Sequence, residues 1–298
     1  MTKPKKQNNA RGGRSRREFL ERTTVAAGGA VLATVSAASC TTAQEKPKGD
    51  QDKKSTQPAT AAGQTTALKG SMTEYKSGDL VVPTYFARST KQGAASAVLV
   101  IHEVFGLNDH IKSIADRIAG EGFHALAPNL FVRASEPPPK DTKDIDALRK
   151  AASSIPVEAA IKDMQAGLDH LKTIKDVRPR FASVGFCMGG GYSYQLATHT
   201  KDLAGAVIFY GRTPVELVPQ VSCPLLGNFG ELDQGIPPEK VREFEAALKK
   251  AGKTADIKIY PGAKHGFFND TRPEAYNAAA AADAWQRTLK FFRERLSA

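Results

Sequence analysis

Short, mostly apolar runs recur along the chain from about residue 71 onward, and amphipathic stretches separate them. Runs of this length without strict alternation are typical of strands that are buried on both faces of a parallel sheet. We expect such strands at residues 97–101, 123–127, 181–186, 206–210, 224–229 and 256–260. Two more polar segments, 72–77 and 80–88, are predicted to pair as a hairpin around Gly78 and Asp79.

The amphipathic stretches predict helices between these strands. Ile111, Ile114, Ala115 and Ile118 repeat at helical spacing, and Asn108 is in place to cap the helix that they define. Further helices are expected at 144–152, at 157–174, from 192 onward, at 238–251 and at 274–296, with a proline-rich loop at 136–139. Strands that alternate with helices predict an α/β fold with a mostly parallel sheet and helices on both faces.

The first 70 residues have a different composition. Residues 1–43 are expected to be an export signal, because Ser15-Arg16-Arg17-Glu18-Phe19-Leu20 resembles the twin-arginine motif and a mildly apolar run follows at 23–38. Cleavage is left open between a lipoprotein-type site, which would leave a lipid on Cys40, and plain cleavage after an alanine such as Ala43. Residues 44–70 contain almost no large apolar side chain and predict a disordered tether before a domain at 71–298.

Most of the net positive charge lies in the N-terminal residues and says little about the function of the domain. The chain carries +11, but residues 1–54 hold twelve Lys/Arg and five Asp/Glu, a net of +7, which leaves +4 for the other 244 residues. A basic leader therefore accounts for most of the charge, and we expect no nucleic-acid partner. The three cysteines form neither a disulfide framework nor a C-x-x-C zinc pattern, so we expect no metal site.

Four chemically capable side chains each follow a predicted strand: Glu103, Cys187, Asp233 and His265. Because ligands of parallel sheets bind beyond the carboxyl ends of the strands, we expect these residues to meet at one edge. Cys187 stands in Gly185-Phe186-Cys187-Met188-Gly189-Gly190, where small neighbours suit a nucleophile on a sharp strand-to-helix turn. The order of nucleophile, acid and histidine is that of α/β-hydrolases.

Each of these residues also has a structural interpretation. Cys187 alone could be a buried packing residue, and a lone histidine is more often structural than catalytic. Glu231 competes with Asp233 for the role of the acid, and His102 could be an edge residue of the site or a packing residue at the strand end. The helix after Cys187 would offer its N-terminal charge and the N–H of Met188 to a developing oxyanion.

Together, four segments resemble the dienelactone hydrolases, or carboxymethylenebutenolidases. They are His102-Glu103-Val104-Phe105-Gly106-Leu107-Asn108, the cysteine turn, Leu232-Asp233 and His265-Gly266-Phe267. The resemblance covers roughly residue 72 to the C-terminus. It implies an α/β-hydrolase fold, with Cys187 as nucleophile, His265 as base and Asp233 as its orienting acid. It also implies that Glu103 controls the protonation of the thiol and that the Val104 N–H joins the Met188 N–H in the oxyanion hole.

The resemblance further implies attack on an ester or lactone, a thioester intermediate and hydrolysis by water, without a metal or organic cofactor. The best-known members bind a substrate carboxylate through arginines, one of them four residues after the catalytic histidine, where this chain has Asn269. Arg149, Tyr210, Arg212 and Asn269 are therefore the candidate substrate-binding residues. We expect an exported monomer whose partners are a small ester or lactone and the twin-arginine machinery, with membrane contact only through a lipid on Cys40.

Two alternatives remain open at this point. One is a surface-tethered binding protein that keeps the hydrolase fold with little catalysis. The other is a redox or thiol-transfer protein that uses Cys187 and Cys223.

Overall fold

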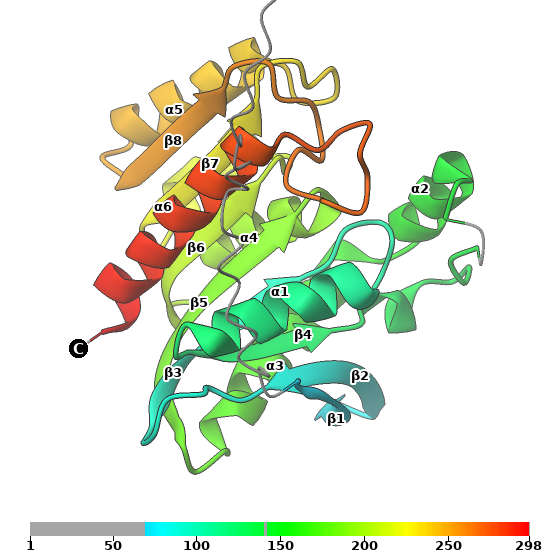
Figure 1. Ribbon diagram of the computed structural model, residues 1–298, viewed down its shortest axis with the longest axis vertical. Helices are drawn as coiled ribbons and strands as arrows, with labels where there is room; N and C mark the ends of the chain where they lie inside the picture. The colour runs from blue at the N-terminus through cyan, green and yellow to red at the C-terminus, as the bar shows by residue number, and fades with distance from the viewer. Residues whose placement is uncertain (1–68, 140–141, 298) are drawn as a thin grey trace, which may run out of the picture. The chain divides into compact units, whose positions relative to one another are not determined.

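The computed structural model describes residues 69–139 and 142–297 (Figure 1). The expected export signal, the candidate lipidation site at Cys40 and nearly all of the expected tether lie outside these residues. None of the helices within the described ranges is long and apolar enough to cross a membrane.

The described residues form one eight-stranded sheet with the strand order β1-β2-β4-β3-β5-β6-β7-β8. Its strands are β1 (Ser71–Ser77), β2 (Leu80–Ala87), β3 (Ala95–Ile101), β4 (His124–Pro128), β5 (Val177–Phe186), β6 (Leu203–Phe209), β7 (Leu225–Gly230) and β8 (Ala255–Tyr260). β1 and β2 pair antiparallel, as do β2 and β4, and every other neighbouring pair is parallel. The predicted hairpin and the mostly parallel sheet are confirmed.

The described chain also contains six α-helices and two short 3₁₀ helices. They are α1 (Asp109–Gly120), η1 (Leu130–Arg133), α2 (Ile145–Ser153), α3 (Val157–Lys172), α4 (Met188–His199), η2 (Val215–Gln220), α5 (Pro238–Lys250) and α6 (Ala278–Leu296). α1 and α6 lie side by side on one face of the sheet, while α3, α4 and α5 cover the other (Figure 1). This arrangement is the α/β-hydrolase type of fold that the sequence predicts.

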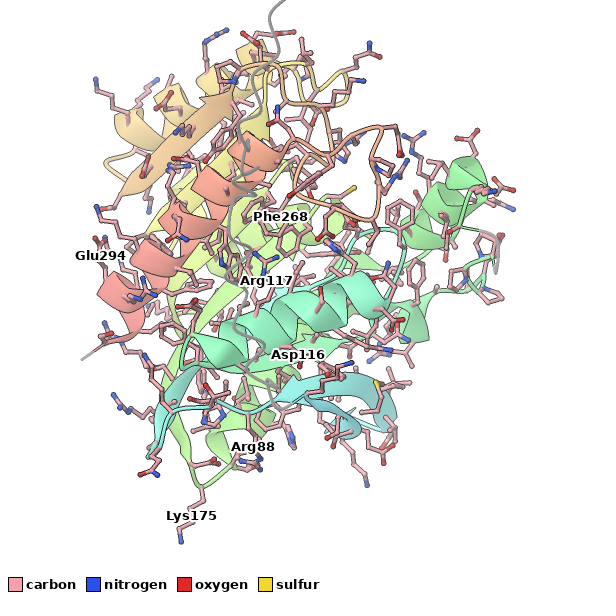
Figure 2. The ribbon with its side chains drawn as sticks, viewed as in Figure 1. Arg88, Asp116, Arg117, Lys175, Phe268 and Glu294 are labelled. Atoms are coloured by element: carbon pink, nitrogen blue, oxygen red, sulfur yellow. The ribbon has the colours of Figure 1, made fainter. Side chains whose placement is uncertain are left out.

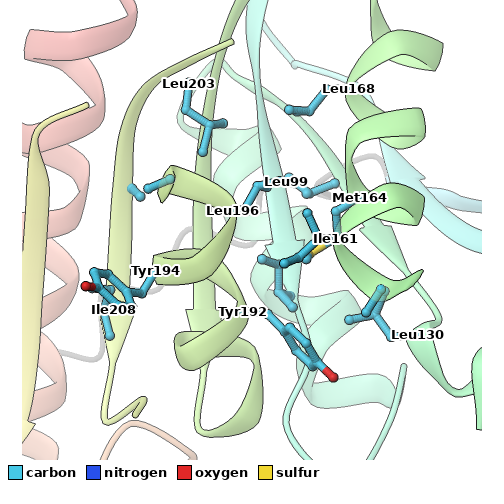
Figure 3. Packing of buried hydrophobic residues seen from close by; sticks show 14 of the residues in the cluster. Leu99, Leu130, Ile161, Met164, Leu168, Tyr192, Tyr194, Leu196, Leu203 and Ile208 are labelled. Atoms are coloured by element: carbon cyan, nitrogen blue, oxygen red, sulfur yellow. The ribbon is translucent and has the colours of Figure 1, made fainter. Parts of the chain in front are cut away.

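Apolar side chains on both faces of the sheet form two core layers. Ile114 of α1 and Leu289 of α6 belong to the layer on one face. On the other face, Met164 and Leu168 of α3 and Leu196 of α4 pack near Leu99 of β3 (Figure 3). All seven residues of β3 are buried, which explains why its sequence is a continuous apolar run rather than an alternating one.

Two predicted helix starts are wrong. α4 begins at Met188 rather than near residue 192, because the glycines after Cys187 belong to the helix and bring its backbone against the neighbouring strands. α6 begins at Ala278 rather than at 274, because Asn277 caps it by accepting a hydrogen bond from the Ala280 N–H at 3.1 Å. The residues before Asn277 form turns in the loop that follows β8.

Candidate active site

Cys187 occupies the turn between β5 and α4 with strained backbone angles, φ 54° and ψ −115°. A non-glycine residue with positive φ costs free energy and persists only where its surroundings hold it. Here the Cys187 N–H donates to the Phe209 carbonyl at 3.0 Å, and the Cys187 carbonyl accepts from the Gly191 N–H at 3.2 Å. The sheet and the helix therefore fix the cysteine at the carboxyl edge of the sheet.

The glycines around Cys187 are required by close backbone contacts. A Cβ at Gly185 would lie 1.9 Å from the Gly189 carbonyl oxygen, and one at Gly189 would lie 2.2 Å from the Ile101 carbonyl oxygen. A Cβ at Gly190 would lie 2.5 Å from the Phe209 carbonyl oxygen. The spacing G-x-C-x-G-G is thus a packing requirement of the turn, as in a nucleophile elbow.

The structure brings Cys187, His265 and Asp233 into one hydrogen-bonded chain. His265 Nε2 lies 3.1 Å from Cys187 Sγ, and His265 Nδ1 lies 2.7 Å from Asp233 Oδ2. Because Asp233 can only accept when ionised, Nδ1 carries the proton that is shared with it. The arrangement orients Nε2 toward the sulfur and suits proton transfer between thiol and imidazole.

The second oxygen of Asp233 is held by the turn that follows β7. Asp233 Oδ1 accepts from the Gly235 N–H at 2.8 Å and from the Ile236 N–H at 2.9 Å. The competing acid, Glu231, instead accepts from the Gly262 N–H at 2.8 Å in an exposed position. The geometry therefore makes Asp233, rather than Glu231, the partner of His265.

The surroundings of His265 favour its protonated form. Burial alone would lower its pKa, but the hydrogen bonds to Asp233 and Cys187 and the charges on both outweigh burial and raise the pKa to about 10. An imidazolium next to the sulfur at neutral pH would stabilise a thiolate, which is the nucleophilic form of cysteine.

Glu103 is a buried carboxyl group close to this chain. Its Oε2 accepts from Asn269 Nδ2 at 2.6 Å, and its Oε1 accepts a longer bond from the Tyr210 hydroxyl at 3.4 Å. Burial raises the pKa of Glu103, and the bond from Asn269, the charges of His265 and Arg272 and the bond from Tyr210 offset only part of that effect. Among the described contacts, no hydrogen bond joins Glu103 to Cys187.

Asn269, one of the candidate substrate-binding residues, is buried and points toward Glu103. Its amide orientation is fixed, because Oδ1 accepts from the backbone N–H of Thr271 at 3.1 Å and from the Thr271 hydroxyl at 2.6 Å. Nδ2 is thereby left to donate to Glu103. The structure thus makes Asn269 a neighbour of a site carboxyl group.

The other three candidate substrate-binding residues lie in different settings. Tyr210 is buried, has a positive φ of 38° and packs its ring edge-on against His265 at 5.1 Å between centroids. Arg212 is exposed just beyond it. Arg149 lies on α2 with a side chain that is 69% exposed and contacts Asp146 of the same helix. Its described contacts do not bring it to the other site residues.

The two backbone N–H groups expected to bind an oxyanion belong to Met188, which follows Cys187 in the chain, and to Val104, which follows Glu103. Met188 is the first residue of α4, and first-turn N–H groups have no acceptor within their own helix. Val104 lies in a turn that the Gly106 N–H closes by donating to the Glu103 carbonyl at 3.1 Å.

His102, beside this turn, is buried, and its Nε2 accepts from the Leu130 N–H at 3.0 Å. Burial lowers the pKa of His102 to about 4, so it is a neutral packing residue.

The loop that carries His265 and Asn269 is tied to α1 and α6. Arg117 of α1 stacks on Trp285 at 4.1 Å and lies 5.5 Å from the Phe268 ring (Figure 2). His110 Nδ1 lies 3.2 Å from Asp270 Oδ1. These contacts position the loop, and no local sequence signal indicates them, because the partners are more than 100 residues apart.

Arg272 is a residue of this loop that the sequence does not single out. Its guanidinium lies 5.0 Å from the centre of the Phe105 ring and is paired with Glu274, and its charge lowers the pKa of Glu103. The sequence offers no signal for it beyond its being an arginine near His265.

Neither metal nor disulfide chemistry has structural support in the described residues. No group of three or more His, Cys, Asp or Glu side chains there could hold a metal ion. Cys187 and Cys223 are both free, and Cys223 is buried with a pKa raised to about 12 by that burial. A thiol held protonated in this way is a poor partner for thiol exchange.

The sequence is similar to proteins of known family. Residues 82–296 match the model of the dienelactone hydrolase family. A curated relative from Escherichia coli O157:H7, named after carboxymethylenebutenolidase, is 36% identical over 230 residues, which are 72% of this chain and 82% of the relative. A relative from Saccharolobus solfataricus with the same name is 36% identical over 242 residues, covering 69% of this chain and 91% of the relative.

Solved structures agree with the sequence comparisons. The crystal structure of a protein from Klebsiella pneumoniae, titled as a dienelactone hydrolase, superposes with a TM-score of 0.71 at 29% identity and covers 76% of this chain and 98% of its own. A metagenomic dienelactone hydrolase-like phosphotriesterase superposes with a TM-score of 0.67 at 24% identity, covers 76% of this chain and 98% of its own, and supports the fold alone. The chain belongs to the dienelactone hydrolase family.

Proposed function

We propose that the protein hydrolyses a small ester or lactone, with Cys187 as nucleophile, His265 as base and Asp233 as the acid that orients it. The observation that carries the proposal is the chain of contacts from Asp233 through His265 to Cys187, at 2.7 and 3.1 Å, on a strained turn. A hydrolase in this family, with a nucleophile and base already within hydrogen-bond reach, fits acyl transfer better than a binding role.

The proposed reaction has two halves. The Cys187 thiolate attacks the carbonyl carbon, and the N–H groups of Met188 and Val104 stabilise the oxyanion that forms. The intermediate collapses to a thioester, and the leaving alkoxide takes a proton from the His265 imidazolium. His265 Nε2 then removes a proton from water, which attacks the thioester and releases the acid and the thiolate.

Glu103 has a separate role in this proposal. Burial raises the pKa of Glu103, so its ionisation is less favourable than that of an exposed glutamate, and a second negative charge in the site would oppose the thiolate. Asn269 and Tyr210 hold the carboxyl group in place. We propose that Glu103 sets the charge around the thiol and so its protonation.

The test is hydrolysis of p-nitrophenyl acetate by variants at the two described cysteines. We expect Cys187→Ala to lower kcat/KM by on the order of a thousandfold or more while the protein stays folded. Cys187→Ser should also lose most activity, because the site is arranged for a thiolate. Cys223→Ala is the matched control and should keep activity, since Cys223 is buried in the core cluster on the α3 face. Turnover retained in Cys187→Ala would reject the assignment and favour the binding-protein alternative.

We also propose that the protein is exported by the twin-arginine pathway. The support is the sequence of residues 1–43, where paired arginines precede an apolar run and small residues. Lipidation at Cys40 and plain cleavage near Ala43 remain the two forms of this proposal.

A further inference from the structure

A cavity of about 310 Å³ lies between η2, the turn that follows Asp233 and the first turns of α5. Its lining includes Arg212, Pro214, Val215 and Ile236. The volume is at the lower end of the range of small-molecule pockets, about 300–1,000 Å³. The hydrolytic steps described above do not use it.

One wall of the cavity begins beside the cysteine turn. A Cβ at Gly211 would lie 2.2 Å from the Gly190 carbonyl carbon, and one at Gly191 would lie 3.3 Å from the Arg212 carbonyl oxygen. The Gly191 N–H in turn donates to the Cys187 carbonyl. The segment that enters the cavity wall at Arg212 therefore packs on the first turn of α4, one helical turn from the sulfur-bearing residue.

Another part of the lining belongs to the turn that holds Asp233. The Gly235 and Ile236 N–H groups both donate to Asp233 Oδ1. Gly235 and Ile236 also line the cavity. A group bound there would thus contact the turn that holds Asp233.

A hydrogen bond and a ring contact hold the cavity walls in place. The hydroxyl of the buried Tyr194 donates to the Pro214 carbonyl at 2.9 Å. The Tyr194 ring also packs edge-on against Phe244 of α5 at 5.2 Å between centroids. A pocket with fixed walls can bind a group without first ordering a loop, which favours binding.

The charges around the cavity cancel. Lys240 and Glu243 pair with each other at 2.8 Å. Arg212 and Glu216, the other two charged lining residues, are exposed and of opposite sign. The lining therefore has no net charge to select a carboxylate, and Pro214, Val215 and Ile236 offer apolar surface.

We propose that this cavity is a substrate subsite for an uncharged apolar group, a short alkyl chain or a phenyl ring, on one side of the ester bond. The proposal rests on the proposed esterase function and adds the class of substrate. Each methylene that enters an apolar site improves binding by about fourfold, and the gain ends when the site is full. The protein should accordingly prefer esters of medium chain length over acetates.

The experiment measures kcat/KM for two ester series: p-nitrophenyl acetate, butyrate and hexanoate, and ethyl, butyl and hexyl acetate. In the unchanged protein, one series should rise by about fourfold per methylene. Val215→Trp should fill the cavity and remove that rise. In the series that rises, kcat/KM for the six-carbon ester should fall at least tenfold, while kcat/KM for the two-carbon ester should stay within twofold. Val215→Phe is a smaller change and should lower kcat/KM for the six-carbon ester less. This variant replaces Val215→Trp in the test if the tryptophan variant unfolds.

Val81→Trp is the matched control, because Val81 is an exposed valine on β2, and it should behave like the unchanged protein. Flat profiles in both series for the unchanged protein, or equal losses on all esters in both Val215 variants, would overturn the subsite. Failure of the proposed function is a different result: no ester would be hydrolysed, or Cys187→Ala would remain active.

Discussion

At the scale of single residues, the buried carboxyl group of Glu103 is expected to lower the stability of the folded protein. A buried carboxyl group with a raised pKa is harder to ionise in the folded protein than in the unfolded chain. Ionisation therefore opposes folding at every pH above the ordinary value of 4.5.

Replacing Glu103 by Gln should separate these two effects. The amide can accept from Asn269 and donate to Tyr210, so the contacts survive while the titration is lost. We expect Glu103→Gln to raise the free energy of unfolding at pH 8, to make little difference below pH 4.5, and to lower kcat/KM. Urea unfolding at both pH values and an ester assay measure this, with the exposed Glu74→Gln on β1 as control. If Glu103→Gln were less stable than the unchanged protein at pH 8, ionisation of Glu103 would not be what opposes folding.

The residues of the site were predictable from the sequence to different degrees. Cys187, Asp233 and His265 each follow a strand and stand in short motifs, so their meeting could be expected. The bond from Asn269 to Glu103 joins positions 166 apart, and Thr271 fixes its direction. No periodicity or motif carries that information, because it depends on how the loop after β8 packs.

At the scale of elements, the junction of β5 and α4 determines where Cys187 lies. The sequence indicated the turn through its glycines, but not that those glycines are helical. Because these glycines have no Cβ, the backbone of α4 can contact the backbone of β3 and β6 directly. A local sequence pattern does not indicate such contacts between distant segments.

A methyl group at this junction should be highly disruptive. We expect Gly189→Ala to cost about 2–4 kcal/mol of stability and to abolish activity, because its Cβ meets the Ile101 carbonyl and backbone must move. Thermal unfolding and the ester assay measure both effects.

Gly120→Ala at the end of α1 is the matched control. Its Cβ would meet nothing within 4 Å, and the change should be neutral or stabilising by up to about 1 kcal/mol. Equal stability of the two variants would contradict the tight-junction account.

At the scale of the whole molecule, the order of apolar strands and amphipathic helices was sufficient to predict the fold class. What it could not give was the order of strands in the sheet, since β4 lies between β2 and β3 through contacts distant in sequence. The start of α6 was also predicted wrongly, at residue 274 instead of 278, because Asn277 rather than hydrophobic periodicity sets it.

The proposed export of the molecule can be tested by mass. Expression in a bacterium with a working twin-arginine pathway should yield a processed protein outside the cytoplasm, and Arg16→Lys with Arg17→Lys should keep it unprocessed inside. A mass that includes diacylglycerol on Cys40 would indicate lipidation, and a start after Ala43 would indicate plain cleavage. Processing unaffected by the two lysines would contradict the twin-arginine proposal.

In the proposed reaction, Cys187 carries the acyl group during turnover. The most direct measurement is mass spectrometry of protein mixed with p-nitrophenyl acetate and quenched in acid before deacylation is complete. The account predicts one added acetyl group, located on the peptide that contains Cys187 and missing in Cys187→Ala. Turnover of the ester with no adduct on Cys187, or with an adduct at another residue that accounts for the rate, would contradict it.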